Sequence, residues 1–355
     1  MFKFLDLEPE SFGLDISDLS LKIVRLKKRG RFFKLSSWGE TNIRKGMIEQ
    51  GEIKYEDALA KEIKNAVAKV KGAKLGTKNV IASLPEKKGF LQVIKMPKMD
   101  EDDLKTAVPF EAENYIPLPL EKSYLDYQLI DSNGSNYINV LVAAMDKSII
   151  DPYFSCFKKA GLVLRALEIE SLAVARSLIK NEFSDFSVLI IDFGKSTTSF
   201  IIYYNSSIVF TSSIPACSGE LTAAIASSLN LDLKEAEKLK IRYGLTSRNK
   251  KEGKKTAAAM GPVLKTLLKN IKKYIDYYDE HNKGKKIKKI LLCGRGSNLA
   301  GLPDLLFSEL KITAEIANPW INILPPDPKE IPELVFKESV GYATALGLAL
   351  RGIKK

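Results

Sequence analysis

The sequence predicts an α/β protein of two lobes, each opening with a β-hairpin, with a small α+β subdomain inserted into the first lobe. Its 355 residues exceed the size of one ordinary domain. Apolar strand patterns alternate with amphipathic helix patterns along the chain. Two similar segments, FGLDIS at 12–17 and LIIDFG at 189–194, each end an apolar strand in an aspartate before a polar turn. This repetition suggests a duplicated, hairpin-led half.

Residues 1–85 form the first part of lobe I. Its strands are short apolar or alternating runs, expected at 12–16, 21–27, 32–38 and 79–84. Residues 55–71 place their apolar side chains on one face and predict a helix.

Residues 86–165 are expected to form the inserted subdomain, because strands and helices there follow a different order. The strands are expected at 90–96, 124–130 and 137–144, with a turn at 131–134, and the helices at 100–115 and 147–160.

The rest of the chain is assigned to three further parts. Residues 166–182 return to lobe I, 183–337 form lobe II, and 338–355 form a C-terminal helix that returns to lobe I. The apolar runs predict strands at 162–168, 187–193 and 287–293, with two more strands between 198 and 214. Helices are expected at 170–179, 218–229, 232–242, 256–281, 303–310 and 339–350.

The composition excludes several classes of protein. The three cysteines, Cys156, Cys217 and Cys293, are odd in number and far apart, which excludes a disulfide framework. A zinc site of Cys and His is excluded, because there is no C-x-x-C and His281 is the only histidine. His281 lies in a lysine-rich stretch, where a solvated side chain is the better interpretation than a catalytic base.

The net charge of +12 raises the question of an anionic partner. Lysines cluster at 27–34, 248–255 and 283–289, and the second cluster reads as a surface loop. None of the clusters is interleaved with aromatics at nucleic-acid spacing. We therefore predict a solvated basic surface and no nucleic-acid binding.

The sequence also predicts a cytoplasmic protein. No segment reaches the ~18–20 apolar residues that cross a bilayer. The N-terminal stretch MFKFLDLEPESFGLDIS carries acids where a signal peptide has its apolar core.

The repeated turns have the chemistry of a phosphate site. In the second turn Gly194 lets backbone amides approach an anion, and Lys195, Ser196, Thr197 and Thr198 add a charge and hydroxyl donors. Asp192 offers oxygen to a hard cation such as Mg²⁺, through water. The first turn, residues 15–22, is its companion. Two such hairpins facing each other would clamp a polyphosphate between two lobes.

Two further features are weaker when taken singly. A glycine turn at 294–298 follows a buried strand, and such turns let a flat ring lie against backbone. Glu237 and Lys240 share one helical face. They either contact a ribose and base or form a surface ion pair, and the pattern alone favours the ion pair.

Together these segments resemble the actin-like ATPase superfamily, and within it the PilM family of type IV pilus assembly proteins, which is related to the cell-division protein FtsA. The resemblance covers nearly the whole chain. It is carried by FGLDISDLSLKIV, FEAENYIPLPLEKSYLDYQ, IDFGKSTTSF, GELTAAIASSLNLDLKEAEKLKIRYG, LLCGRGSNLAGLPDLL and VGYATALGLALRG. The second of these segments is the most specific to PilM. The resemblance implies an actin-like ATPase fold that binds ATP and Mg²⁺.

The resemblance implies a role for each matching residue. Asp15 and Asp192 would lie near the metal and phosphates, and Glu170 would be an acid on the first helix that crosses between the lobes. The nucleotide-binding positions would be Ser17, Asp18, Ser20, Lys22, Gly194, Lys195, Ser196, Thr197, Thr198, Gly219, Glu220, Glu237, Lys240, Gly294, Arg295, Gly296, Ser297 and Asn298. No residue is assigned as a catalytic base.

Three departures from the superfamily pattern bear on activity. Ser17 stands for a usual glycine, and Asp18 and Leu19 for usual serines. Arg295 stands for a usual middle glycine, where it would cover the adenine ring. Binding is still expected, with slow or no ATP hydrolysis.

The resemblance also implies a function. It is that of a scaffold on the inner face of the inner membrane, which binds the cytoplasmic N-terminal tail of PilN near the insertion and links it to the pilus assembly motors. Self-association is compatible with this role. The alternatives are an FtsA-like division protein and a small-molecule kinase of the same superfamily. Against the first, the chain runs almost directly from its last helix to Lys355, without the linker and amphipathic helix usual in FtsA.

Overall fold

The computed structural model describes residues 10–130, 136–246, 250–282, 284–328 and 330–353. The N-terminal nine residues used in the signal-peptide argument and the turn predicted at 131–134 lie outside these ranges. So do residues 248, 249 and 283 of the lysine clusters.

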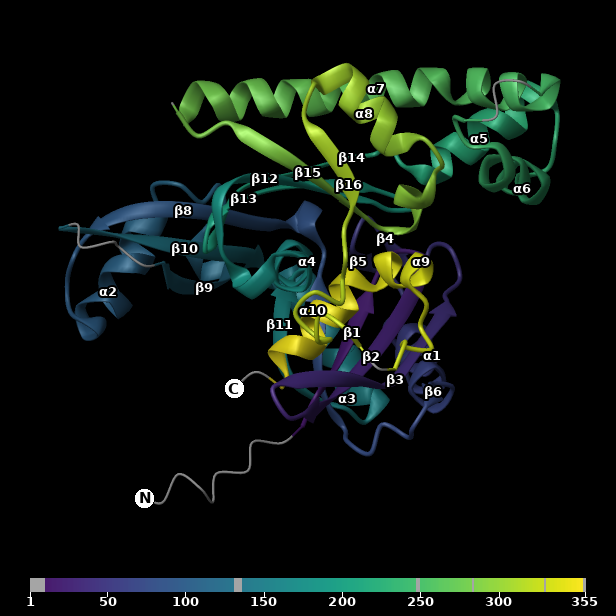
Figure 1. Cartoon of the computed structure of the whole chain (residues 1–355). Helices are drawn as coiled ribbons and strands as arrows, with labels where there is room; N and C mark the ends of the chain where they lie inside the picture. The colour runs from purple at the N-terminus through teal and green to yellow at the C-terminus, as the bar shows by residue number, and fades with distance from the viewer. Residues whose placement is uncertain (1–9, 131–135, 247–249, 283, 329, 354–355) are drawn as a thin grey trace.

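The first lobe is built on a six-stranded sheet in the order β11-β7-β1-β2-β3-β6 (Figure 1). Strands β1 to β3 form an antiparallel meander, and β7 and β11 continue the sheet in parallel from β1. The strand bounds are β1 Phe12–Ile16, β2 Ser20–Arg29, β3 Phe32–Asn42, β6 Lys71–Gly72, β7 Asn79–Leu84 and β11 Val163–Ile169. Every residue of β1 is buried, as an apolar strand in the middle of a covered sheet requires.

The second lobe repeats this arrangement in a five-stranded sheet, β14-β13-β12-β15-β16. An antiparallel meander, β12 to β14, is again followed by two parallel strands. The bounds are β12 Ser184–Phe193, β13 Thr198–Asn205, β14 Ser207–Ile214, β15 Ile287–Cys293 and β16 Thr313–Ile316. The matching order confirms the predicted α/β fold with a duplicated hairpin-led half.

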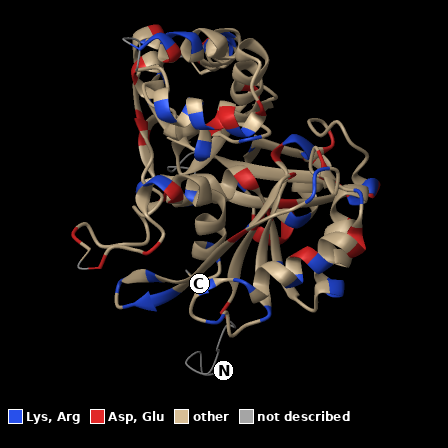
Figure 2. Ribbon diagram, turned by 90° about the vertical axis from the view of Figure 1, so that its right-hand side faces the viewer, with Lys and Arg blue, Asp and Glu red and all other residues tan. Residues whose placement is uncertain are grey.

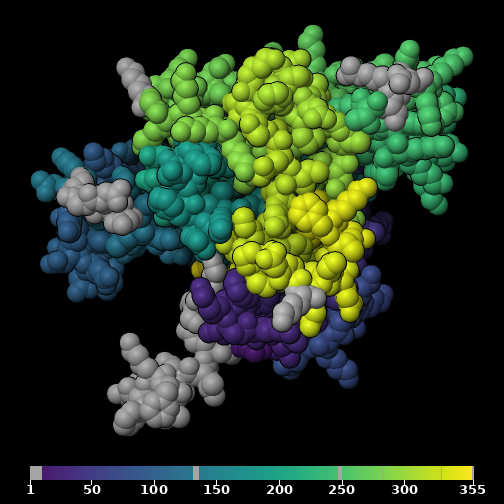
Figure 3. All heavy atoms as spheres, viewed as in Figure 1, coloured from purple at the N-terminus to yellow at the C-terminus, as the bar shows by residue number. Residues whose placement is uncertain are grey.

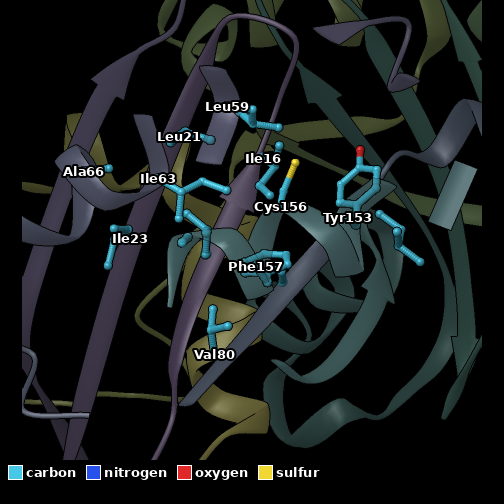
Figure 4. Close-up of a cluster of buried hydrophobic side chains, with 14 of the residues drawn as sticks. Ile16, Leu21, Ile23, Leu59, Ile63, Ala66, Val80, Tyr153, Cys156 and Phe157 are labelled. Atoms are coloured by element: carbon cyan, nitrogen blue, oxygen red, sulfur yellow. The ribbon is translucent and has the colours of Figure 1, made fainter. Parts of the chain in front are cut away.

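Helices cover the outer face of each sheet. In the first lobe these are α1 Glu56–Ala68 and α3 Lys147–Ala160, whose apolar faces meet the strands in one core (Figure 4). In α1 the buried side chains Leu59, Ile63 and Ala66 recur every three or four residues, as an amphipathic helix requires. In the second lobe they are α5 Ser218–Leu229, α6 Leu233–Tyr243, α7 Lys251–His281 and α8 Leu302–Leu310.

Two helices lie between the sheets. α4 Glu170–Leu178 packs on the second sheet and α10 Ala343–Arg351 on the first, and the two helices contact each other. Gly347 makes that contact possible, since a Cβ there would come within 1.8 Å of the Ala173 carbonyl oxygen. α9 Phe336–Ser339 precedes α10. The C-terminal segments therefore lie directly on the N-terminal ones, as the space-filling view shows (Figure 3).

A three-stranded sheet, β8-β10-β9, forms the insertion with α2. The bounds are β8 Gly89–Pro97, α2 Glu101–Ala112, β9 Ser123–Ile130 and β10 Tyr137–Asp146. α3 and the first three residues of β11 fall inside the range 86–165 assigned to this subdomain. Their apolar side chains belong to the core of the first lobe, however, because β11 pairs with β7 and α3 packs on α1. We therefore propose that the insertion spans about residues 89–146.

Several local features differ from the sequence predictions. The prediction of a surface loop over 248–255 is wrong for residues 251–255, which form the first turns of α7. Lysine and glutamate are good helix formers, and Gly253 and Thr256 turn toward the core. The short strands β4 Ile48–Glu49, β5 Glu52–Ile53, β6 and β16 were not predicted. Runs of two to four residues carry too little periodicity to identify.

Candidate functional site

A cavity of about 210 Å³ lies between the two lobes. The turn after β1 and the turn after β12 both line it, as the duplicated hairpins predict. Its lining includes Asp15, Ser17, Asp18, Ser20, Lys22, Glu170, Asp192, Gly194, Lys195, Ser196, Thr197, Gly294 and Arg295. The structure thus brings thirteen of the predicted site residues to one cavity.

The first turn is held by its own hydroxyl groups. The backbone N–H of Ser17 donates to the Ser20 carbonyl oxygen at 2.9 Å, and the Ser20 N–H donates to Ser17 Oγ at 3.1 Å. Ser17 Oγ also donates to the Ser20 carbonyl oxygen at 3.0 Å. Serine at position 17 therefore tightens the turn where the superfamily commonly has glycine.

Asp18 is the acid that departs from the superfamily pattern. Its carboxylate accepts hydrogen bonds from the backbone N–H groups of Gln50 and Gly51, at 3.1 and 2.9 Å. These amides belong to the β4–β5 turn. Since two donors neutralise part of its charge, Asp18 ties the first turn to the neighbouring hairpin and repels an anion in the cavity less than a free carboxylate would.

The second turn is a tight backbone loop at the start of the second meander. The Gly194 N–H donates to the Thr197 carbonyl oxygen at 3.0 Å, and the Gly219 N–H, at the start of α5, donates to the Lys195 carbonyl oxygen at 3.0 Å. A Cβ at Gly219 would meet that oxygen at 2.4 Å. The side chains of Lys195 and Ser196 stay exposed at the cavity. The loop therefore offers a charge and a hydroxyl group without using them for its own fold.

The third turn closes over the cavity from the second lobe. Gly294 has φ +76°, and a Cβ there would lie 2.3 Å from Asp192 Oδ1, so glycine fits this position on both counts. The next residue, Arg295, forms an ion pair with Glu40 of β3 in the first lobe. The arginine was predicted to cover an adenine ring. In the structure its guanidinium group joins the two lobes through the Glu40 carboxylate, and the role toward adenine stays a prediction.

Six acidic residues line this cavity. Asp18 accepts hydrogen bonds from two backbone amides and Glu40 pairs with Arg295, and the other four are Asp15, Glu86, Glu170 and Asp192. Burial raises the pKa of Asp192 from 3.8 to about 6; Lys22 opposes this shift and Asp15 adds to it. Burial also raises the pKa of Glu170 well above its usual range, and Asp15, Asp192 and Glu86 raise it further. The pKa of Glu86 is raised by burial, and its Oε2 has no hydrogen-bond partner.

Mg²⁺ prefers carboxylate and water ligands. Among the described residues no three acidic, cysteine or histidine side chains are placed to hold a metal ion directly, so a cation here would be bound through water. Lys22 Nζ lies 3.3 Å from Asp15 Oδ2, and Ser83 Oγ donates to Asp15 Oδ1 at 3.2 Å. Asp15 is thereby held in place at the wall. A divalent cation between Asp15 and Asp192 would supply the positive charge that the four carboxyl groups lack.

The predicted pair Glu237 and Lys240 does not line this cavity. Lys240 Nζ is buried and lies 2.8 Å from Glu237 Oε2, 2.9 Å from Ser218 Oγ and 2.8 Å from Thr222 Oγ1. The lysine therefore binds α6 to the first turn of α5. The sequence left two alternatives for this pair, a contact with ribose and base or a surface ion pair. The structure contains the ion pair, but its lysine is buried rather than solvated.

The remaining predicted residues surround the cavity without lining it. Thr198 Oγ1 donates to the Ala216 carbonyl oxygen at 2.7 Å, and Ser297 Oγ donates to the Gly294 carbonyl oxygen at 2.7 Å. Asn298 Nδ2 donates to the Lys337 carbonyl oxygen at 2.8 Å. Gly219 and Glu220 open α5, and Gly296 packs against Phe193. These contacts hold the turns in shape.

Sequence reasoning missed several lining residues, chiefly Glu40, Glu86 and Gly341. Glu86 follows β7, which runs parallel to β1. The carboxyl ends of parallel strands share one sheet edge, so an acid just after β7 was a detectable signal. Glu40 and Gly341 carry no such signal, because only the tertiary fold brings them to the cavity.

Within the part of the chain that the structure describes, none of the helices combines the length and the apolar character that crossing a bilayer requires.

Known proteins are similar to this chain over most of its length. The profile of the family described as type IV pilus assembly protein PilM matches residues 13–353. A chain from a solved structure, the PilM-PilN type IV pilus biogenesis complex, is 28% identical with a TM-score of 0.83. That match covers 98% of this chain and 100% of the other. MreB5 of Spiroplasma citri bound to ADP, 13% identical with a TM-score of 0.51 over 94% of each chain, shares the fold.

Cell-division proteins FtsA match shorter segments. The FtsA of Enterococcus hirae is 26% identical over 254 residues, which are 65% of this chain and 57% of that one. The FtsA of Neisseria meningitidis serogroup B is 34% identical over 92 residues, 26% of this chain and 22% of that one. The chain thus matches less than two thirds of either FtsA. The PilM profile spans both lobes and the insertion, and the protein therefore belongs to the PilM family of type IV pilus assembly proteins.

Proposed function

We propose that this protein is a scaffold of the type IV pilus assembly machinery that binds ATP with Mg²⁺ and holds the cytoplasmic N-terminal tail of PilN. The observation that carries the proposal is the similarity to a chain of the PilM-PilN complex, which covers 98% of this chain. Through PilN the protein would sit on the inner face of the cytoplasmic membrane and connect with the assembly motors. Self-association is compatible with this role.

The interlobe cavity supports the nucleotide part of the proposal. Backbone amides of the second turn, with Lys195 and Ser196, would hold phosphate oxygens. Asp15 and Asp192 would hold Mg²⁺ through water, and the cation would neutralise phosphate charge. The nucleoside would lie along the turn at Gly294, toward the side of the cleft where Lys240 joins α5 and α6.

We expect ATP hydrolysis to be slow or absent. A general base must be ionised to take a proton from water. Glu170 is the acid on the crossing helix, where burial and the neighbouring carboxyl groups raise its pKa and favour its protonated form. No other residue is assigned as a base toward an attacking water.

The insertion and its neighbour α3 support the partner part. β9 is an edge strand of the insertion, which leaves one row of backbone groups open to an extended peptide. Beside it, the exposed rings of Tyr124 and Phe154 pack edge to face with their centroids 6.0 Å apart. Exposed aromatic rings of this kind give a peptide side chain an apolar contact.

The nucleotide proposal is tested by thermal unfolding with and without Mg-ATP. Ligand at about 100 times its Kd stabilises the native state by about 2.7 kcal/mol, which raises Tm by several degrees. Mg²⁺ alone and Mg-GTP serve as controls. An unchanged Tm at millimolar Mg-ATP contradicts nucleotide binding.

The partner proposal is tested separately by calorimetry with a peptide of the PilN cytoplasmic tail. We expect saturable binding of one peptide per protein, and no binding of a peptide with the same composition in scrambled order. If the protein binds Mg-ATP but the peptide gives no heat of binding, the partner proposal is wrong and the nucleotide proposal is unaffected.

A further inference from the structure

The long helix α7 carries a straight row of lysines on its outer side. We call this set the lysine ridge. Its seven members are all exposed and are Lys251, Lys254, Lys255, Lys265, Lys269, Lys272 and Lys273. At a rise of 1.5 Å per residue, the ridge is about 33 Å long. Asp276 and Glu280 end it.

The ridge lies opposite the buried face of the helix. The residues that pack into the second lobe include Met260, Leu264 and Ile271, and they recur at helical spacing. At 100° per residue these side chains and the lysines fall on opposite sides of α7. α7 runs along the edge of the second lobe, away from the interlobe cavity (Figure 1). The ridge is therefore free to meet a large surface.

The charge of the ridge is largely unneutralised. Lys272 pairs with Glu309 at 3.4 Å, and the other six lysines have no ion pair within the described ranges. Lys54, Lys88 and Lys159 of the first lobe all lie in ion pairs. Along the ribbon, basic and acidic residues are mixed on many elements, while the β2–β3 hairpin carries a second basic stretch with exposed Lys28, Arg29, Arg31 and Lys34 (Figure 2). The ridge is a row of positive charge on a single helix.

The residue types of the ridge favour a membrane surface over a partner that is recognised by individual hydrogen bonds. α7 contains no arginine, the residue that recognises individual carboxylates and phosphates with two parallel hydrogen bonds. Lysines behave as flexible point charges. Between the lysines, the uncharged exposed side chains of α7 are Ala258, Pro262 and Thr266, which are too small to insert between acyl chains. Such a surface adsorbs to anionic headgroups without penetrating them.

We propose that the lysine ridge of α7 docks the second lobe against a membrane surface containing anionic phospholipid. The contact is electrostatic, runs along the helix from Lys251 to Lys273, and is independent of nucleotide and of any protein partner. It fixes how the molecule is oriented, with α7 parallel to the bilayer and the first lobe farther from it.

Vesicle flotation tests the proposal with the full chain. Vesicles of phosphatidylcholine with 30% phosphatidylglycerol are compared with vesicles of phosphatidylcholine alone. We expect binding to the anionic vesicles only, weakening as salt rises from 50 to 300 mM, because salt screens the attraction. Lys254→Glu/Lys265→Glu/Lys269→Glu should weaken binding by on the order of 100-fold, since each lysine near an anionic surface contributes about 1 kcal/mol.

The matched control is Lys61→Glu/Lys64→Glu/Lys69→Glu on the exposed side of α1 and just beyond its end, which changes the net charge equally in the other lobe. It should keep most of the binding, and circular dichroism confirms that both variants fold. If the two variants lose vesicle binding equally, the proposal for the ridge is wrong and binding depends only on the overall net charge. Binding to a DNA duplex in 150 mM salt without vesicle binding overturns the membrane as partner, as does absence of vesicle binding in 50 mM salt.

Discussion

Asp192 combines burial with a position on the cavity wall. Its pKa is raised to about 6, so between about pH 4 and pH 6 the native carboxyl group keeps a proton that the unfolded chain has released. The free energy of unfolding therefore falls as pH rises through this window, and the full loss is present above pH 6. Above pH 6 Asp192 is therefore a buried anion that costs stability, and a cation bound beside it would offset that cost.

Asp192→Asn should remove that loss. Without divalent cations we expect the variant to exceed the wild type in stability by about 2–3 kcal/mol at pH 7.5 and to equal it near pH 4. Urea unfolding across this pH range is the measurement. In addition, Mg-ATP should stabilise the wild type at pH 7.5 more than the variant. A difference between the two proteins that does not change with pH contradicts this account of Asp192.

Thr197→Arg should abolish nucleotide binding while the fold survives. The second turn uses the Thr197 carbonyl oxygen and not its side chain, so the backbone loop persists, and the added arginine occupies the cavity. Thermal unfolding should show a Tm near that of the wild type and no shift with Mg-ATP. Thr266→Arg on the exposed side of α7 is the control and should keep the shift. A shift retained in Thr197→Arg would place the nucleotide elsewhere.

At this scale the sequence predicted the residues at the ends of the hairpins well. Asp15, Asp192 and Gly194 face the cavity because a strand end and a tight turn are local features. Partners across the cavity, such as Glu40 for Arg295, depend on how two distant sheets approach each other. Local sequence carries no information on that approach.

Among the elements, the crossing of α10 and α4 is the tightest helix contact. At Gly347 a Cβ would lie 1.8 Å from the Ala173 carbonyl oxygen, so Gly347→Ala must push the helices apart, at a cost of about 3 kcal/mol or more. Gly261→Ala, in α7, meets nothing within 4 Å and should stabilise the protein by about 0.5–1 kcal/mol. Urea unfolding of the two variants should give opposite signs, and equal signs would contradict the packing argument.

Long elements were predictable, and short ones were not. α3 and α5 begin and end within a residue of their predicted bounds, because their apolar periodicity is strong and a glycine or asparagine in left-handed conformation ends each. The start of α7 was missed because five charged or glycine residues in a row resemble a loop. The helix continues there since Gly253 and Thr256 complete its buried face.

For the whole molecule, the insertion should be separable from the nucleotide site. Gly89 and Met145 are paired neighbours on β8 and β10, so a Gly-Ser-Gly linker can replace residues 90–144. We expect the shortened protein to keep the Tm shift with Mg-ATP. Calorimetry should show that it no longer binds the PilN tail peptide. Peptide binding that survives the deletion would move the partner site to the lobes, and loss of the Mg-ATP shift would mean that the insertion supports the lobes.

The packing of α10 on the first sheet has a consequence for synthesis of the chain. The strands β1 and β2 are made near the beginning, and α10, which covers their inner face, is made after more than 300 further residues. At about 5–20 residues per second, that interval is roughly 15–65 s on the ribosome. During this time Val24, Leu26 and Trp38 lack their cover. The lobe that is translated first is therefore the last to finish folding, and its nascent form is a natural client for chaperones.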